Sequence, residues 1–337
     1  MADLPSSSIA IGIPVRDEEA LLPRLLQALS RQREVDPETV TVAFLLDGCT
    51  DASEAVVRGW DAPFATLVSS IARAEPNAGR ARRAAMTMAE ASGAARLATT
   101  DADSAPAPDW LASIGRALAD ADVVAGRIVR SPERPDPAQD AVERYYDRLH
   151  AHRREIDPVA WDPAPGHHHT GGANLAFRAE AYRALGGFDP VPCGEDALIV
   201  DRAHRLGLRV RRDAAARVET SSRRCGRAPG GLASALAWHD RGGPARVAHP
   251  ADVTWQYHGQ AIARAAFARL DGSATELASR LGLPVDEILT VAGECPNAEA
   301  FAMRIAPAVP GGPRIVTLAE AQAALDALAD ARAEVAA

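Results

Sequence analysis

Arg96-Leu97-Ala98-Thr99-Thr100-Asp101-Ala102-Asp103 joins a short apolar segment to two closely spaced carboxylates. The segment before Asp101 predicts a buried strand that ends at these carboxylates. Because residues i and i+2 of an extended backbone point the same way, Asp101 and Asp103 can converge on one object beyond the strand. In an open α/β sheet, ligands bind at that edge. A hard divalent cation that holds a phosphate suits such a pair, and a solvated Asx turn is the alternative.

The flanking sequence alternates between apolar runs and amphipathic segments. This alternation predicts an α/β fold, with a mostly parallel, Rossmann-like sheet flanked by helices on both faces. Strands are expected at 9–13, 41–46, 64–68, 96–100, 122–129 and 208–218, and helices after Asp17 and at 79–91, 109–118, from 137 and from 195. The texture then becomes Ala-rich and helical, so we expect a catalytic domain over 1–234 and a helical C-terminal extension over 235–337.

Composition restricts the class of partner. The chain has 337 residues, a hydrophobic fraction of 47% and a net charge of -8. This charge argues against nucleic acid, whereas local arginine clusters at 80–83 and 223–227 suit a small anionic ligand. The four cysteines are scattered, and neither a signal peptide nor a transmembrane segment is indicated, so we expect a cytoplasmic protein.

Acidic residues follow two of the expected strands. The first ends in Pro14-Val15-Arg16-Asp17-Glu18-Glu19, and the second in Asp47-Gly48-Cys49-Thr50-Asp51. Carboxylates at these positions suit contacts to ribose hydroxyls or to a base N–H. Because the chain contains neither GxGxxG after the first strand nor GxxxxGK[ST], a conventional dinucleotide-binding dehydrogenase and a P-loop enzyme are both disfavoured.

Five segments in the same order resemble the motifs of family 2 glycosyltransferases. Ile13–Glu19 is similar to IPxYNEE, Leu46–Asp51 to DDGSTD and Asp101–Asp103 to DxD. Gly171–Arg178 with Gly186–Asp189 is similar to GxNxAFRR…GGFD, and Gly194-Glu195-Asp196 to the ED motif. The resemblance implies a GT-A fold and a nucleotide-diphosphate-sugar donor, with a UDP-sugar favoured. Processive members carry QxxRW and transmembrane helices, which this chain lacks, so we expect transfer of a single sugar.

The resemblance also implies residue roles. Asp101 and Asp103 would hold Mg²⁺ or Mn²⁺, with Asp103 the more direct ligand, while Asp196 would be the general base with Glu195 beside it. The remaining donor-site residues are expected to be Pro14, Arg16, Glu18, Asp47, Arg80, Gly172, Asn174, Arg223 and Arg227. The arginines near 223 are expected to fold over the diphosphate or, alternatively, to form a solvated basic linker.

The chain departs from the family pattern at several positions. Arg16-Asp17 replaces the usual Tyr-Asn, Leu46 replaces an acidic residue, and no His follows the last expected strand. The run His167–His169 could supply the missing metal ligand or line the acceptor site.

The sequence therefore predicts a metal-dependent, inverting glycosyltransferase with an unidentified acceptor and a possible homodimer. The alternatives are a catalytically inactive sugar-nucleotide-binding protein and a sugar nucleotidyltransferase. The latter would need a Gly-rich, Lys-containing loop after the first strand, which is not present.

Overall fold

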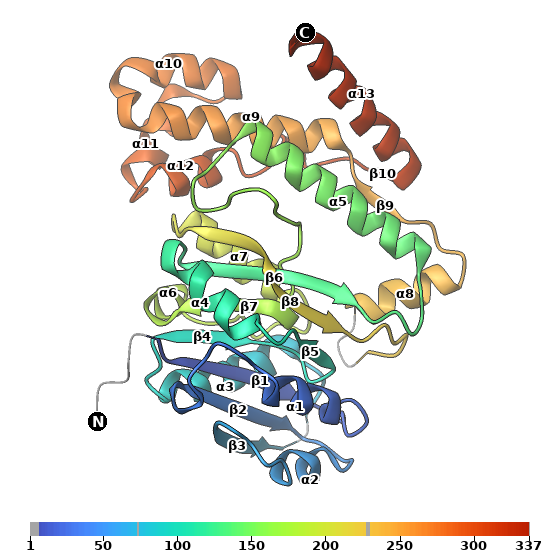
Figure 1. Ribbon diagram of the computed structural model, residues 1–337. Coiled ribbons are helices and arrows are strands. Elements are labelled where there is room, and N and C mark those ends of the chain that lie inside the picture. The colour runs from blue at the N-terminus through green and yellow to red at the C-terminus, as the bar shows by residue number, and fades with distance from the viewer. Residues whose placement is uncertain (1–6, 73, 227–229, 337) are drawn as a thin grey trace. The chain divides into compact units, whose positions relative to one another are not determined.

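A computed structural model describes residues 7–72, 74–226 and 230–336 (Figure 1). The chain divides into two compact units, each built from several segments. Unit 1 comprises Met1–Pro135, His169–Arg202 and Val210–Ala237, and unit 2 comprises Asp136–His168, Ala203–Arg209 and Trp238–Ala337. The separate C-terminal extension from residue 235 stays a prediction.

Unit 1 is organised around an eight-stranded sheet in the order β3-β2-β1-β4-β7-β6-β8-β5 (Figure 1). Its strands are β1 (Ile9–Val15), β2 (Val40–Asp47), β3 (Ala65–Ile71), β4 (Arg96–Thr99), β5 (Ser104–Pro106), β6 (Val123–Arg130), β7 (Leu175–Arg178) and β8 (Val210–Thr220). The four strands β3, β2, β1 and β4 are parallel, so their carboxyl ends meet at one edge. This edge is the one at which Asp101 and Asp103 were expected.

Helices cover both faces of this sheet. The helices of unit 1 are α1 (Leu22–Ser30), α2 (Ser53–Arg58), α3 (Ala78–Ala91), α4 (Trp110–Asp120), α6 (Ala179–Leu185), α7 (Glu195–Arg205, whose last residues belong to unit 2) and α8 (Leu232–Asp240, likewise shared). Short 3-10 turns lie at η1 (Pro37–Thr39) and η2 (Gly172–Asn174). The predicted α/β architecture is therefore confirmed.

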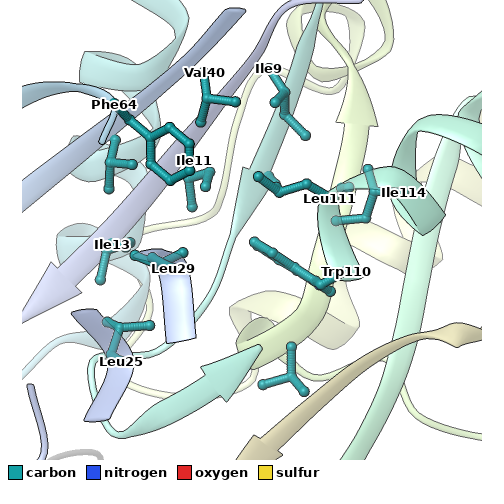
Figure 2. Close-up of a cluster of buried hydrophobic side chains, with 14 of the residues drawn as sticks. Ile9, Ile11, Ile13, Leu25, Leu29, Val40, Phe64, Trp110, Leu111 and Ile114 are labelled. Carbon is teal, nitrogen blue, oxygen red and sulfur yellow. The ribbon is translucent and has the colours of Figure 1, made fainter. Parts of the chain in front are cut away.

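Alternate side chains of β1 point to opposite faces of the sheet. Ile9, Ile11 and Ile13 point into a core that α1 and α4 close, with Trp110 fully buried among them (Figure 2). Gly12 faces the other side, where a Cβ would lie 2.9 Å from the backbone of Ala85 in α3. A glycine is therefore needed there for α3 to pack closely on the sheet.

The sheet is mixed, with four parallel and three antiparallel strand pairings. β7 runs antiparallel to both β4 and β6, and β5 runs antiparallel to β8. Neither strand was expected, because Leu175–Arg178 and Ser104–Pro106 are too short to show a period of two. β7 matters for the site, since it places the preceding Gly171-Gly172 segment beside the end of β4.

Unit 2 is mainly helical and has its own apolar cores. Its helices are α5 (Pro137–Ile156), α9 (Pro250–Ala266), α10 (Leu270–Leu281), α11 (Val285–Gly293), α12 (Ala298–Ile305) and α13 (Leu318–Ala336), with the 3-10 turn η3 (Phe267–Arg269) and the two-stranded sheet of β9 (Arg246–Ala248) and β10 (Ile315–Thr317). The start of α5 agrees with its sequence, since Asp136 accepts a hydrogen bond from the Gln139 N–H at 2.9 Å and Pro137 occupies the first turn.

A search of the described residues for a helix that could cross a membrane found none with the required length and apolarity.

A buried ionic cluster joins three segments of unit 2. The Glu299 carboxylate hydrogen-bonds His204 Nδ1 at 3.2 Å and accepts from Arg264 Nε at 3.0 Å, and Arg264 also pairs with Asp157. Burial alone would raise the pKa of Glu299, but the His204 hydrogen bond and the Arg264 charge outweigh it and lower the pKa to about 2. The ionised carboxylate therefore stabilises this unit.

The lowered pKa predicts a specific acid sensitivity. A depressed carboxyl pKa contributes stability above its unfolded value of 4.5, and this stability is lost as the pH falls toward about 2. We expect Glu299→Gln to remove on the order of 3 kcal/mol of unfolding free energy at pH 7 and progressively less below pH ~4. Urea unfolding of both proteins between pH 3 and pH 7 measures this, and parallel curves would contradict it.

Candidate active site

The carboxyl ends of the parallel strands border a cavity of about 360 Å³. Most of the predicted site residues line it, although they come from distant parts of the sequence. These residues are Pro14, Arg16, Glu18, Asp47, Asp101, Asp103, Gly172, Glu195, Asp196 and Arg223. The fold therefore brings the acidic strand ends, the DxD-like pair and the Glu195-Asp196 pair to one place.

Asp101 and Asp103 converge, but for a different reason from the one expected. β4 ends at Thr99, and the carboxylates lie in a turn that leads into β5, with the Ser104 N–H donating to the Asp101 carbonyl at 3.1 Å. The Asp103 side chain is only 13% exposed, against 35% for Asp101. Burial raises the pKa of Asp103 and the negative charge of Asp101 raises it further, which Arg223 only partly offsets. The pair carries an excess of negative charge that a cation would neutralise.

Each carboxylate of this pair already contacts one arginine. Arg82 Nη2 donates to Asp101 Oδ1 at 2.9 Å, and Arg223 Nη2 lies 3.1 Å from Asp103 Oδ2. Arg223 Nη1 also donates to Glu18 Oε2 at 2.6 Å. Arg223 was expected near the diphosphate, and it lies in the cavity next to the DxD-like turn. Arg227 of the same segment lies outside the described residues.

Arg82 is the site residue that the sequence did not identify. It lies in α3 two residues after Arg80, within the basic run 80–83, which was expected to suit a small anionic ligand but from which only Arg80 was assigned to the site. Its side chain is 7% exposed and lines the cavity. Its best sequence indication was that Ala81, Ala85 and Ala89 mark the buried face of α3, which Arg82 borders.

Asp196 is oriented by the first turn of α7 and by the Gly171-Gly172 segment. Its Oδ2 accepts the Gly172 N–H at 2.8 Å, and it occupies the positive end of the α7 dipole. Asp196 is partly exposed and borders the cavity, so it can meet a ligand hydroxyl there.

Asp47 lines the same cavity and lies between two arginines. Its Oδ2 accepts from Arg16 Nη1 at 3.0 Å, and Arg80 Nη2 lies 3.6 Å from its Oδ1. Asp47 is 2% exposed, and no described residue hydrogen-bonds its Oδ1. A buried carboxylate oxygen without a hydrogen bond is costly unless a ligand N–H satisfies it. Arg80 thus lies beside the Asp47 carboxylate, although the Arg80 side chain does not line the cavity.

Asn174 lies outside the cavity. Its amide oxygen accepts from Trp110 Nε1 at 2.8 Å, and its amide nitrogen donates to the carbonyls of Arg127 and Ala216 at 3.0 and 2.8 Å. The side chain is almost completely buried, so its polar atoms bind the protein rather than a ligand. Asn174 supports the segment that carries Gly172.

The donor set fits a hard divalent cation with few protein ligands. Asp101 and Asp103 offer carboxylate oxygens beside one cavity, and Mg²⁺ is commonly held by one or two carboxylates together with substrate phosphates. Among the described residues, no group of three His, Cys, Asp or Glu ligand atoms includes either aspartate. A third protein ligand, from His167–His169 or elsewhere, is therefore not found beside the pair within that part of the chain.

Comparisons with known proteins identify the family and the fold. The family model for Glycosyl transferase family 2 matches residues 10–185. The fold is similar to that of S. aureus TarS 1–349 in complex with UDP-GlcNAc, with 15% identity, coverage of 88% of this chain and 90% of that chain, and a TM-score of 0.53. TarS 1–349 in complex with UDP is similar at 12% identity, with coverage of 89% and 81% and a TM-score of 0.51. No curated protein matches the chain in sequence.

The position of Asn174 generates a stability prediction. Asn174→Ala leaves the indole N–H of Trp110 and the two carbonyls without their partner, and each buried unsatisfied group costs about 1–3 kcal/mol. We expect the free energy of unfolding, measured in urea, to fall by at least about 2 kcal/mol. A loss below about 0.5 kcal/mol, the level of an ordinary surface substitution, would contradict the assignment of Asn174 as a buried support.

Proposed function

The chain belongs to glycosyl transferase family 2 and is a glycosyltransferase, and we propose that it transfers a single sugar, with inversion, from a nucleotide-diphosphate donor to an acceptor hydroxyl. The observation that carries the proposal is the single cavity shared by Asp101, Asp103 and Asp196. A cation site for the leaving diphosphate and a separate carboxylate for the acceptor are the groups that this reaction needs.

In the proposed reaction, Asp196 accepts the proton of the acceptor hydroxyl. The hydroxyl oxygen attacks the anomeric carbon, the bond from that carbon to the diphosphate oxygen breaks, and the diphosphate leaves with the electron pair. The Gly172 N–H, which donates to Asp196 Oδ2 at 2.8 Å, orients this carboxylate at the start of α7. Arg223 is placed to contact the diphosphate, since its guanidinium borders the cavity beside Asp103.

Asp101 and Asp103 would hold Mg²⁺ or Mn²⁺ with the diphosphate. When bound, the cation neutralises the charge that develops on the leaving group. The position of both carboxylates beside one cavity supports this assignment.

The side chains of Arg16, Asp47 and Arg80 favour uracil as the donor base. Arg16 Nη1 donates to Asp47 Oδ2 at 3.0 Å, and Arg80 Nη2 lies 3.6 Å from Asp47 Oδ1, so this group combines one acceptor with two flanking donors. Uracil offers the complementary edge, with its N3–H between two carbonyl oxygens, whereas guanine would direct a second N–H donor at an arginine. TarS, which has a similar fold, is bound to UDP-GlcNAc. A homodimer and a cytoplasmic location stay predictions.

The general-base assignment is tested by Asp196→Asn. Because the amide cannot accept the proton, we expect kcat to fall about 10²–10⁴-fold while nucleotide affinity, measured by calorimetry, is retained. Asp201→Asn is the matched control, since Asp201 is an exposed residue of the same helix and does not line the cavity. An equal loss of affinity and turnover in Asp196→Asn would indicate a structural cap instead.

The base preference is tested by the melting temperature in the presence of Mn²⁺ and equal concentrations of UDP or GDP. A selective ligand raises the melting temperature by mass action, so we expect a larger rise with UDP. Arg16→Met removes one flanking donor and should narrow the difference between the two nucleotides. A larger rise with GDP in the unmodified protein would refute the proposed base contacts.

A further inference from the structure

Arg82 joins residues of the cavity that are far apart in the sequence. Its guanidinium donates to Asp101 Oδ1 at 2.9 Å and to Glu195 Oε1 at 3.0 Å. It also donates to Thr99 Oγ1 at 3.1 Å and to the Gly172 carbonyl at 2.9 Å. One planar group thus binds the end of β4, the DxD-like turn, the Gly171-Gly172 segment and the start of α7.

The backbone of Gly172 extends this connection to the proposed base. Its carbonyl accepts from Arg82, and its N–H donates to Asp196 Oδ2 at 2.8 Å. A Cβ on Gly172 would lie only 2.4 Å from Arg82 Cζ, so no other residue fits without displacing the guanidinium. Asp101 on the donor side and Asp196 on the acceptor side are therefore connected through Arg82 and the backbone of Gly172 by three hydrogen bonds.

The charge of Arg82 is held in place by its partners. Burial would lower the pKa of Arg82, but the carboxylates of Asp101 and Glu195 raise it above the ordinary value, so the side chain stays ionised. Phe188 covers it, with its ring centroid 5.8 Å from Cζ. Lysine could supply the charge but not the fork of donors that reaches four acceptors at once.

We propose that Arg82 is a positioning residue that sets the separation between the leaving group at Asp101 and the base at Asp196. This inference rests on the proposed function for the identity of those two groups. The nucleoside contacts of Arg16, Asp47 and Arg80 do not involve Arg82. Loss of Arg82 therefore affects transfer and leaves most of the donor affinity, because misplacement by about 1 Å can cost about 100-fold in rate.

The experiment compares Arg82→Met and Arg82→Lys with the control Arg83→Met. Arg83 lies next in α3, donates to the Phe188 carbonyl at 2.9 Å and does not line the cavity. We expect both Arg82 variants to lose at least about 100-fold in kcat, with the donor KM changed by less than about threefold. Hydrogen exchange of the Gly172 amide, followed by mass spectrometry, should accelerate at least about tenfold in Arg82→Met and not in Arg83→Met.

Gly172→Ala tests the same connection if Arg82→Met does not fold. It keeps the arginine and the charge, and should reproduce the selective loss of kcat. Retention of kcat within about threefold in a folded Arg82→Met or Gly172→Ala protein overturns the proposal, as does an unchanged Gly172 exchange rate in Arg82→Met. If the unmodified chain transfers no sugar from any nucleotide donor, the proposed function fails, and the exchange rates still decide whether Arg82 fixes the Gly172–Asp196 contact.

Discussion

The buried guanidinium of Arg82 is the interaction on which the arrangement of the cavity depends. A charge that is removed from water is tolerated only when it is paired and hydrogen-bonded, and Arg82 meets this requirement with Asp101, Glu195, Thr99 and Gly172. Because these partners come from four different segments, satisfying one side chain fixes the relative positions of all four. The sheet edge supplies the segments, and the arginine holds them together.

Carboxylates are also paired with arginines elsewhere in the cavity. Asp47 lies between Arg16 and Arg80, and Arg223 bridges Glu18 and Asp103. In the proposed function, the arginines would allow a protein with a net charge of -8 to receive an anionic diphosphate, and the carboxylates would hold the cation. Such a site is neither simply basic nor simply acidic, which is suited to a ligand that combines phosphates, a metal ion and a base.

Sequence reasoning identified the parallel strands that end at the site, and most of the site residues that it predicted line the cavity, because apolar runs and acidic strand ends are local patterns. It missed Arg82, since nothing in the run from Arg80 to Arg83 shows which arginine points inward. It placed Asn174 among the donor-site residues, whereas the Asn174 amide hydrogen-bonds Trp110 and two backbone carbonyls. It also missed β7, a strand of four residues that exists because β4 and β6 pair with it. These features depend on contacts between distant segments, which no local pattern encodes.

A crystal structure of the protein with UDP and Mn²⁺, with the metal located by its anomalous scattering, would test the account most directly. The account predicts one strong peak between the diphosphate and the Asp101–Asp103 turn, with Arg82 still bound to Glu195 and Gly172 and with Asp196 facing the open end of the cavity. A metal bound elsewhere, or a diphosphate that lies away from this turn, would contradict it.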